Sequence, residues 1–175
     1  MSERKKIILI GMPSIGKSYW GKQIAEAYNL KFIDLDAEIE KISGLKISDM
    51  FESFGEDYFR DKEHKILKVI LLQSEKAVIA TGGGTPCFFN NLDLMKDSGL
   101  VVYLKADIDF IYQNLEKAGQ AKRPLLSSPD SESDGIQKLH DLFEQRRGFY
   151  EKADLQIDVT EKTLSQIIKI ISAEG

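Results

Sequence analysis

Cysteine and histidine are scarce in this chain of 175 residues, which contains one cysteine and two histidines. A single cysteine cannot form an internal disulfide, nor can it supply the thiolates of a structural zinc site. His64 has no metal-ligand spacing to other residues, so we assign it no role. Because no histidine base accompanies Cys87 in a motif, we interpret Cys87 as a small packed residue rather than a nucleophile.

The chain also lacks a long apolar segment and an excess of positive charge. Its N-terminal apolar stretch is too short for a signal peptide or a membrane span, so we expect a cytoplasmic protein without a membrane partner. Lys and Arg number 24 against 28 Asp and Glu, which argues against nucleic acid as a partner. The length and a hydrophobic content of 42% fit one domain over residues 1–175.

The sequence GMPSIGKS at residues 11–18 has the spacing of a phosphate loop, G-x-x-x-x-G-K-[ST]. An apolar run precedes it and a helical pattern follows it, which is the context that the motif requires. Backbone N–H groups in such a loop surround phosphate oxygens, and the helix N-terminus adds its positive dipole end. Lys17 can reach the β- and γ-phosphates, and the Ser18 hydroxyl can ligate Mg²⁺. A chance glycine-rich turn is the alternative, which the flanking elements disfavour.

Two acids lie in the next predicted strand, at residues 31–36. Asp34 and Asp36 are two residues apart, so we expect both on the same face of that strand. Ligands gather at the carboxyl ends of parallel strands, which makes the two acids candidates for holding Mg²⁺ and a substrate hydroxyl. The alternative is that one of them only caps the following helix, and for Asp36 capping and function can coexist.

Further candidate residues lie on the elements in the middle of the chain. Residues 56–74 have helical spacing, and Arg60 and Glu63 can pair on this helix, as a solvated pair in the simplest interpretation. The apolar run at 77–81 predicts a strand that ends in three glycines, 82–84. Such glycines allow the backbone to approach a ligand closely. A flexible turn is the alternative for them.

Residues 118–131 differ in composition from the rest, because Gly, Pro and Ser surround two basic residues. We predict a lid there, with Arg123 as the cation that reaches the γ-phosphate. A solvated loop charge is the alternative. The predicted helix at 135–151 carries Arg146 and Arg147 near its end, where cations are favourable in any case. Strands alternating with helices along the chain predict a parallel α/β sheet.

Taken in order, these motifs resemble those of the shikimate kinase family over nearly the whole chain. The phosphate loop is shared by many nucleotide-binding proteins, so the specific signal lies downstream. It consists of FIDLD at 32–36, a segment ending in FRDKE at 59–63, ATGGG at 80–84, KRPLL at 122–126 and Arg146 four residues before Tyr150. The resemblance implies a three-layer P-loop kinase fold: a five-stranded parallel sheet with helices on both faces, a lid, and a substrate-binding segment at about 34–63.

The resemblance also implies an activity, the ATP-dependent phosphorylation of the 3-hydroxyl of shikimate to give shikimate 3-phosphate and ADP. This reaction belongs to the biosynthesis of chorismate and aromatic amino acids, and family members are usually monomers. Catalysis would fall to Lys17, Asp36 and Arg123, and Mg²⁺ would be held by Ser18 and, through water, by Asp34. The implied substrate-binding residues are Asp36, Arg60, Gly83 and Arg146, and the implied ATP-binding residues are Gly11, Ser14, Ile15, Gly16, Lys17, Ser18, Tyr19 and Arg123.

Two departures from the family pattern accompany this resemblance. Ile15 stands where the family usually has a small residue, so we expect it to crowd the phosphate cradle. Glu116 replaces a basic residue that packs on adenine in some family members. The sequence therefore leaves the contacts to the adenine ring open. One alternative function is a related small-molecule kinase such as gluconate kinase, which Arg60 and Arg146 disfavour. The other is a regulatory nucleotide-binding protein that has lost catalysis, which the intact catalytic set disfavours.

Overall fold

The computed structural model describes residues 6–74, 76–118 and 132–174. Within them, five strands form one sheet with the order β2-β3-β1-β4-β5, and every neighbouring pair is parallel. The strands are β1 (Lys6–Ile10), β2 (Lys31–Asp34), β3 (Ala77–Ala80), β4 (Leu100–Lys105) and β5 (Leu155–Asp158). The predicted five-stranded parallel sheet is therefore confirmed.

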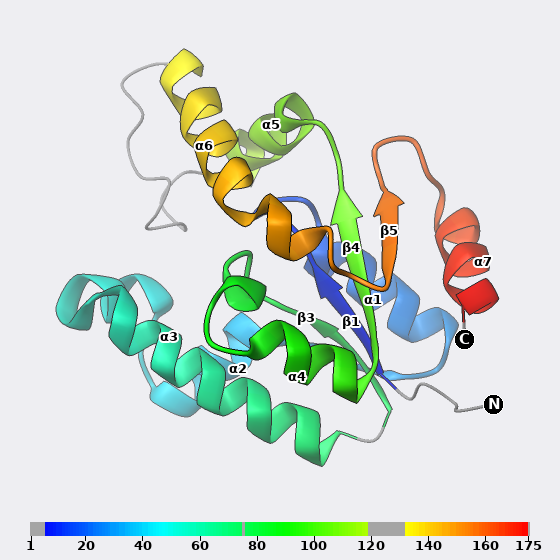
Figure 1. Cartoon of the computed structure of the whole chain (residues 1–175), viewed down its shortest axis with the longest axis horizontal. Coiled ribbons are helices and arrows are strands. Elements are labelled where there is room, and N and C mark those ends of the chain that lie inside the picture. Colours follow the sequence, from blue (N-terminus) through cyan, green and yellow to red (C-terminus); the bar gives the residue numbers. More distant parts are fainter. Residues whose placement is uncertain (1–5, 75, 119–131, 175) are drawn as a thin grey trace.

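Helices cover both faces of this sheet, which gives the predicted three layers (Figure 1). α1 packs against α7 on one face, and α3 lies against α4 on the other. No helix in the described part of the chain is long and apolar enough to cross a membrane. The helical elements are α1 (Lys17–Ala27), α2 (Leu35–Ser43), α3 (Ile47–Gln73), the 3₁₀ turn η1 (Thr85–Cys87), α4 (Asn91–Ser98), α5 (Ile108–Ala118), α6 (Glu132–Tyr150) and α7 (Leu164–Glu174).

The central strand β1 is buried along its length because it is a continuous apolar run. Ile8, Leu9 and Ile10 have no exposed surface, as expected for a parallel strand covered by helices on both faces. Leu9 is in register with Ala80 of β3, and Ile10 is in register with Tyr103 of β4. The loops that leave β1 and β3 therefore begin side by side.

Two predictions about the neighbouring elements have different outcomes. The strand predicted at 31–36 is wrong in its last two residues, because β2 ends at Asp34 and α2 begins at Leu35. The Asp34 carboxylate accepts a hydrogen bond from the Ala37 N–H (3.3 Å) and caps α2, a role that the sequence suggested for Asp36. The helix predicted over 56–74 is confirmed as the later part of α3, and Gly55, with a φ of 81°, interrupts the helical backbone just before it.

The carboxyl ends of the strands carry most of the candidate residues. Figure 1 shows α5 and α6 beyond the arrowheads of the strands, on the same side as the loops that follow β1 and β3. In open parallel sheets this edge is where ligands bind. The fold therefore gathers the phosphate loop, the two acids and the glycine turn at one end of the molecule.

Candidate active site

The loop between β1 and α1 has the backbone geometry of a phosphate cradle. Three of its residues have a left-handed backbone: Gly11 (φ 142°), Ser14 (φ 62°) and Gly16 (φ 98°). A side chain at Gly11 is excluded, because its Cβ would collide with the carbonyl oxygen of Leu104. Alternating backbone handedness turns successive N–H groups to the same side, which creates a concave site for an anion.

Lys17 and Ile15 of this loop have different surroundings. The Lys17 ammonium donates hydrogen bonds to the carbonyl oxygens of Gly11 and Met12, both at 2.8 Å, and so is held over the loop. Ile15 packs in the apolar core with 1% of its surface exposed. Because Ile15 also borders the cavity next to the phosphate loop, the expectation that it crowds the cradle stays a prediction.

Asp34 and Asp36 reach the site from the start of α2. The Ser18 hydroxyl donates to the second carboxylate oxygen of Asp34 at 2.5 Å, which links the phosphate loop to the second strand. Asp36 lies in the first turn of α2, and its carboxylate is beside Gly82, 3.1 Å from where a Cβ on that glycine would be. The two acids thus converge on the site from one helix turn rather than from one strand face.

These groups border one cavity of about 720 Å³, a size that suits a small-molecule ligand site. The cavity is lined by the phosphate loop, the two acids, the start of the glycine turn and residues of α5. Sequence reasoning did not anticipate the α5 residues, although Asn114 donates to the carbonyl of Ser14 (3.3 Å) and so ties α5 to the phosphate loop. The lining residues are Ser14, Ile15, Gly16, Lys17, Ser18, Tyr19, Trp20, Asp34, Asp36, Thr81, Gly82, Gly83, Phe110, Asn114 and Lys117.

Arg60 is a buried cation, so the interpretation of Arg60 and Glu63 as a solvated pair is wrong. Arg60 is 4% exposed and Glu63 is fully buried. The Arg60 guanidinium donates to Glu63 at 2.8 Å and to Glu56 at 3.0 and 3.1 Å. It also stacks on the rings of Phe59 and Phe88, at 5.1 and 4.3 Å from their centroids. These contacts together hold the guanidinium in one position.

A second buried arginine, Arg146, lies across the glycine turn from Arg60. Arg146 is 6% exposed, and its guanidinium is 3.0 Å from the Cβ position of Gly83. A Cβ on Gly84 would collide with the Arg60 guanidinium, so only glycine lets the backbone pass there. The turn therefore lies against both cations, and Tyr150 holds it in place by donating to the Gly83 carbonyl at 2.6 Å. Neither arginine lines the described cavity, which ends at Gly83.

The donor set near the phosphate loop is one of oxygens. Among the described residues, no group of three or more His, Cys, Asp or Glu side chains is placed to hold a metal. Ser18 and Asp34 instead offer a hydroxyl and a carboxylate, which are ligands that Mg²⁺ accepts when phosphate and water complete its shell. The predicted lid lies outside the described residues from residue 119 on, and so does Arg123.

Cys87 ends η1, after the glycine turn, and lies near enough to both arginines for their charges to act on its thiol. Burial raises the pKa of its thiol from 9.0 to about 11, while the positive charges of Arg146 and then Arg60 act in the opposite direction. At neutral pH the side chain is therefore a protonated, weakly reactive thiol. This agrees with the interpretation of Cys87 as a packed residue.

Alkylation of Cys87 by iodoacetamide should be about 100-fold slower in the native protein than in the urea-unfolded chain at pH 7, because the two pKa values differ by about two units. The native rate should keep rising about tenfold per pH unit up to about pH 10, whereas the unfolded rate should level off above pH 9. Mass spectrometry can follow the reaction, since the chain has no other cysteine. A native rate that levels off near pH 8 would contradict the raised pKa.

Comparisons with known proteins agree with this geometry. The family model described as shikimate kinase matches residues 13–174. A shikimate kinase from Sulfurihydrogenibium sp. (strain YO3AOP1) is 41% identical over 95% of this chain and 95% of its own length. The structure of a shikimate kinase from Acinetobacter baumannii in complex with shikimate has a TM-score of 0.88 and 30% identity, covering 98% of this chain and 93% of that one. A shikimate kinase structure from Aquifex aeolicus has a TM-score of 0.78 and 34% identity, covering 96% and 94%.

Proposed function

The chain belongs to the shikimate kinase family, and from this premise we propose that it transfers the γ-phosphoryl group of ATP to the 3-hydroxyl of shikimate, as a monomer that acts on small molecules. In this reaction the bond between the γ-phosphorus and the β–γ bridging oxygen breaks. A new bond forms between that phosphorus and the 3-oxygen of shikimate, and the hydroxyl proton is released. The products are shikimate 3-phosphate and ADP.

The observation that carries the proposal is the pair of buried arginines beside the glycine turn. A buried cation is costly unless an anion and hydrogen bonds compensate it. Glu63 and Glu56 compensate Arg60, whereas Arg146 lies next to Gly83 at the end of the cavity. A small carboxylate bound between the two guanidinium groups would receive charge-assisted hydrogen bonds from both. We call the space between the Arg60 and Arg146 guanidinium groups the arginine corner, and we assign it to the carboxylate of shikimate.

The ring hydroxyls of shikimate would then extend from this corner toward the phosphate loop. Asp36 lies beside Gly82 and borders the same cavity as the phosphate loop. Its carboxylate can accept a hydrogen bond from the reacting hydroxyl and so orient that oxygen toward the γ-phosphate. The Gly83 N–H would provide a second contact to the substrate. Because phosphoryl transfer depends mainly on positioning and electrostatic stabilisation, this placement suffices without a strong base.

The phosphate end of the cavity would bind ATP through the loop at residues 11–18, with Tyr19 next to it. Lys17 is positioned to stabilise negative charge on the transferring group. Ser18 and Asp34 would hold Mg²⁺, Asp34 through water, and their oxygen atoms fit that ion. Bound Mg²⁺ neutralises charge on the β- and γ-phosphates. Arg123 is the proposed lid cation.

Release of ADP from ATP and Mg²⁺ tests this function directly. We expect turnover with shikimate, with gluconate turned over at least about 100-fold more slowly, because the arginine corner orients one particular ring carboxylate. Adding excess EDTA should stop the reaction and adding Mg²⁺ should restore it. Mass spectrometry of the product should show one added phosphoryl group on shikimate. ATP binding without turnover of shikimate would refute the proposal and favour a regulatory nucleotide-binding protein.

A further inference from the structure

The Glu63 carboxylate, on which Arg60 depends, is itself held by a residue outside the predicted site. Its first oxygen accepts a hydrogen bond from the Thr85 hydroxyl at 2.7 Å, and its second accepts from Arg60 at 2.8 Å. Both Thr85 and Glu63 are fully buried. In such surroundings each hydrogen bond to a carboxylate contributes strongly, because water cannot replace it.

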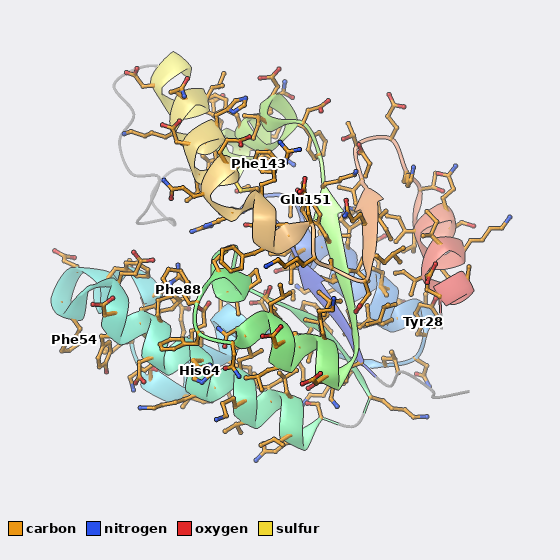
Figure 2. All side chains as sticks on the ribbon, in the orientation of Figure 1. Tyr28, Phe54, His64, Phe88, Phe143 and Glu151 are labelled. Atoms are coloured by element: carbon orange, nitrogen blue, oxygen red, sulfur yellow. The ribbon has the colours of Figure 1, made fainter. Side chains whose placement is uncertain are left out.

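Thr85 is in turn fixed by the elements around it. It opens η1 directly after the glycine turn, and its N–H donates to the carbonyl of Gly82 at 3.2 Å. The fully buried Asn91 donates its side-chain amide to the carbonyl of Thr85 at 2.9 Å. His64 of α3 contacts the other end of that amide, at 2.6 Å between its Nδ1 and the Asn91 Oδ1. Figure 2 labels His64, which lies on α3, and Phe88, which directly follows η1.

These contacts form one continuous polar chain from α3 through α4 and η1 and back to α3. It runs from His64 through Asn91, Thr85 and Glu63 to Arg60. Its two ends, His64 and Arg60, are four residues apart on α3. This polar chain matters for the site because its last member is the Arg60 guanidinium, which lies at the glycine turn. Displacement of Glu63 would remove one of the two carboxylates that pair with the Arg60 guanidinium.

We propose that Thr85 is a positioning residue for substrate recognition: its hydroxyl orients the Glu63 carboxylate, and that carboxylate holds Arg60 in the plane that binds the substrate carboxylate. The inference rests on the proposed function, because it takes Arg60 as a ligand of shikimate. The Thr85 hydroxyl donates to Glu63, so we infer that Thr85 acts on substrate binding through this carboxylate.

The Thr85→Val substitution removes the hydroxyl and keeps the shape of the side chain. We expect the KM for shikimate, and its Kd measured by calorimetry, to rise about 10- to 100-fold, since one hydrogen bond to a buried charge is lost. The KM for ATP should change less than about twofold, because the phosphate loop is not part of the polar chain. Thr85→Ser keeps the hydroxyl and should restore shikimate affinity to within about threefold of the parent.

A matched control separates positioning from a general loss of stability. Tyr28→Phe removes a hydroxyl that donates to the Ile168 carbonyl (3.1 Å) and contacts Ser172 (2.6 Å), where α1 meets α7. It should lower the melting temperature without changing the KM for shikimate. Coupling can also be measured: in a Glu63→Gln background, adding Thr85→Val should change kcat/KM much less than it does in the parent.

The outcomes distinguish this inference from the proposed function. If the parent enzyme turns over shikimate but Thr85→Val keeps its shikimate KM and Kd, Thr85 is only structural and the inference is wrong. Full additivity of Thr85→Val with Glu63→Gln would also refute it. If the parent itself does not use shikimate, the proposed function is what fails. Should Thr85→Val not fold, Thr85→Ala carries the same expectation for the KM and Kd.

Discussion

Replacing Arg60 by alanine should lower kcat/KM for shikimate by about 100- to 1,000-fold, with nucleotide affinity nearly unchanged. The guanidinium would otherwise give the substrate carboxylate charge-assisted hydrogen bonds in a buried corner, where truncating one partner typically costs 2–5 kcal/mol, or about 30- to several thousand-fold. Steady-state kinetics with each substrate varied in turn would show the loss in kcat/KM for shikimate and not in the KM for ATP. Turnover close to that of the parent would show that the carboxylate binds elsewhere.

Stability must be measured alongside, because Arg60→Ala also leaves Glu63 buried without its cation. Breaking a buried ion pair on one side costs about 3–5 kcal/mol of unfolding free energy. Arg60→Lys keeps a positive charge but loses the planar fork, so it should fold better and still bind shikimate about tenfold or more weakly. Arg147→Ala is the matched surface control. Its side chain is 52% exposed and pairs with Glu144 and Glu151, so both activity and stability should change little.

The phosphate loop shows what a sequence can predict well. Its geometry depends on nearby residues: two glycines, a lysine and a serine at fixed spacing between a strand and a helix. Gly11 and Gly16 have the left-handed backbone that the motif requires, and Lys17 lies back over the loop. The same is true of the parallel sheet, because each strand is a short apolar run that can be recognised by itself.

Features that depend on tertiary packing were harder to predict. Arg60 and Glu63 are three residues apart, which predicts a pair but not its burial. Their burial comes from η1, where Phe88 and Thr85 cover them from a distant part of the chain. The burial of Ile15 in the apolar core could likewise not be predicted from the spacing of the phosphate loop.

The acids at the end of β2 show a third situation, in which both residues border the cavity although the predicted local structure was wrong. Asp34 and Asp36 were expected on one face of a strand, yet the chain turns into α2 after Asp34. Both side chains still border the cavity. Residues at the end of a strand and in the first turn of the next helix can reach the same edge of the sheet. The predicted location of the two acids therefore holds although the predicted end of the strand was wrong.

Replacing Lys17 by methionine should lower kcat by about 100- to 1,000-fold, the usual effect of removing one preorganised donor of transition-state stabilisation. The Lys17 ammonium is already held by two backbone carbonyls, so it can stabilise the transferring phosphoryl group with little reorganisation. Methionine keeps most of the length of the side chain and removes its charge. Single-turnover measurements with saturating ATP and shikimate would report the chemical step.

The two ends of the cavity should respond differently to this substitution. Lys17→Met should leave the Kd of shikimate, measured without nucleotide, within about twofold of the parent value, since Lys17 belongs to the phosphate loop and the arginine corner lies at the glycine turn. Lys22→Met, on the exposed side of the same helix, should leave both kcat and shikimate binding unchanged. If Lys17→Met weakened shikimate binding as strongly as Arg60→Ala does, the division of the cavity into a phosphate end and a carboxylate end would be wrong. If kcat survived Lys17→Met, another cation would have to stabilise the transferring group, and Arg123 would be the first to substitute.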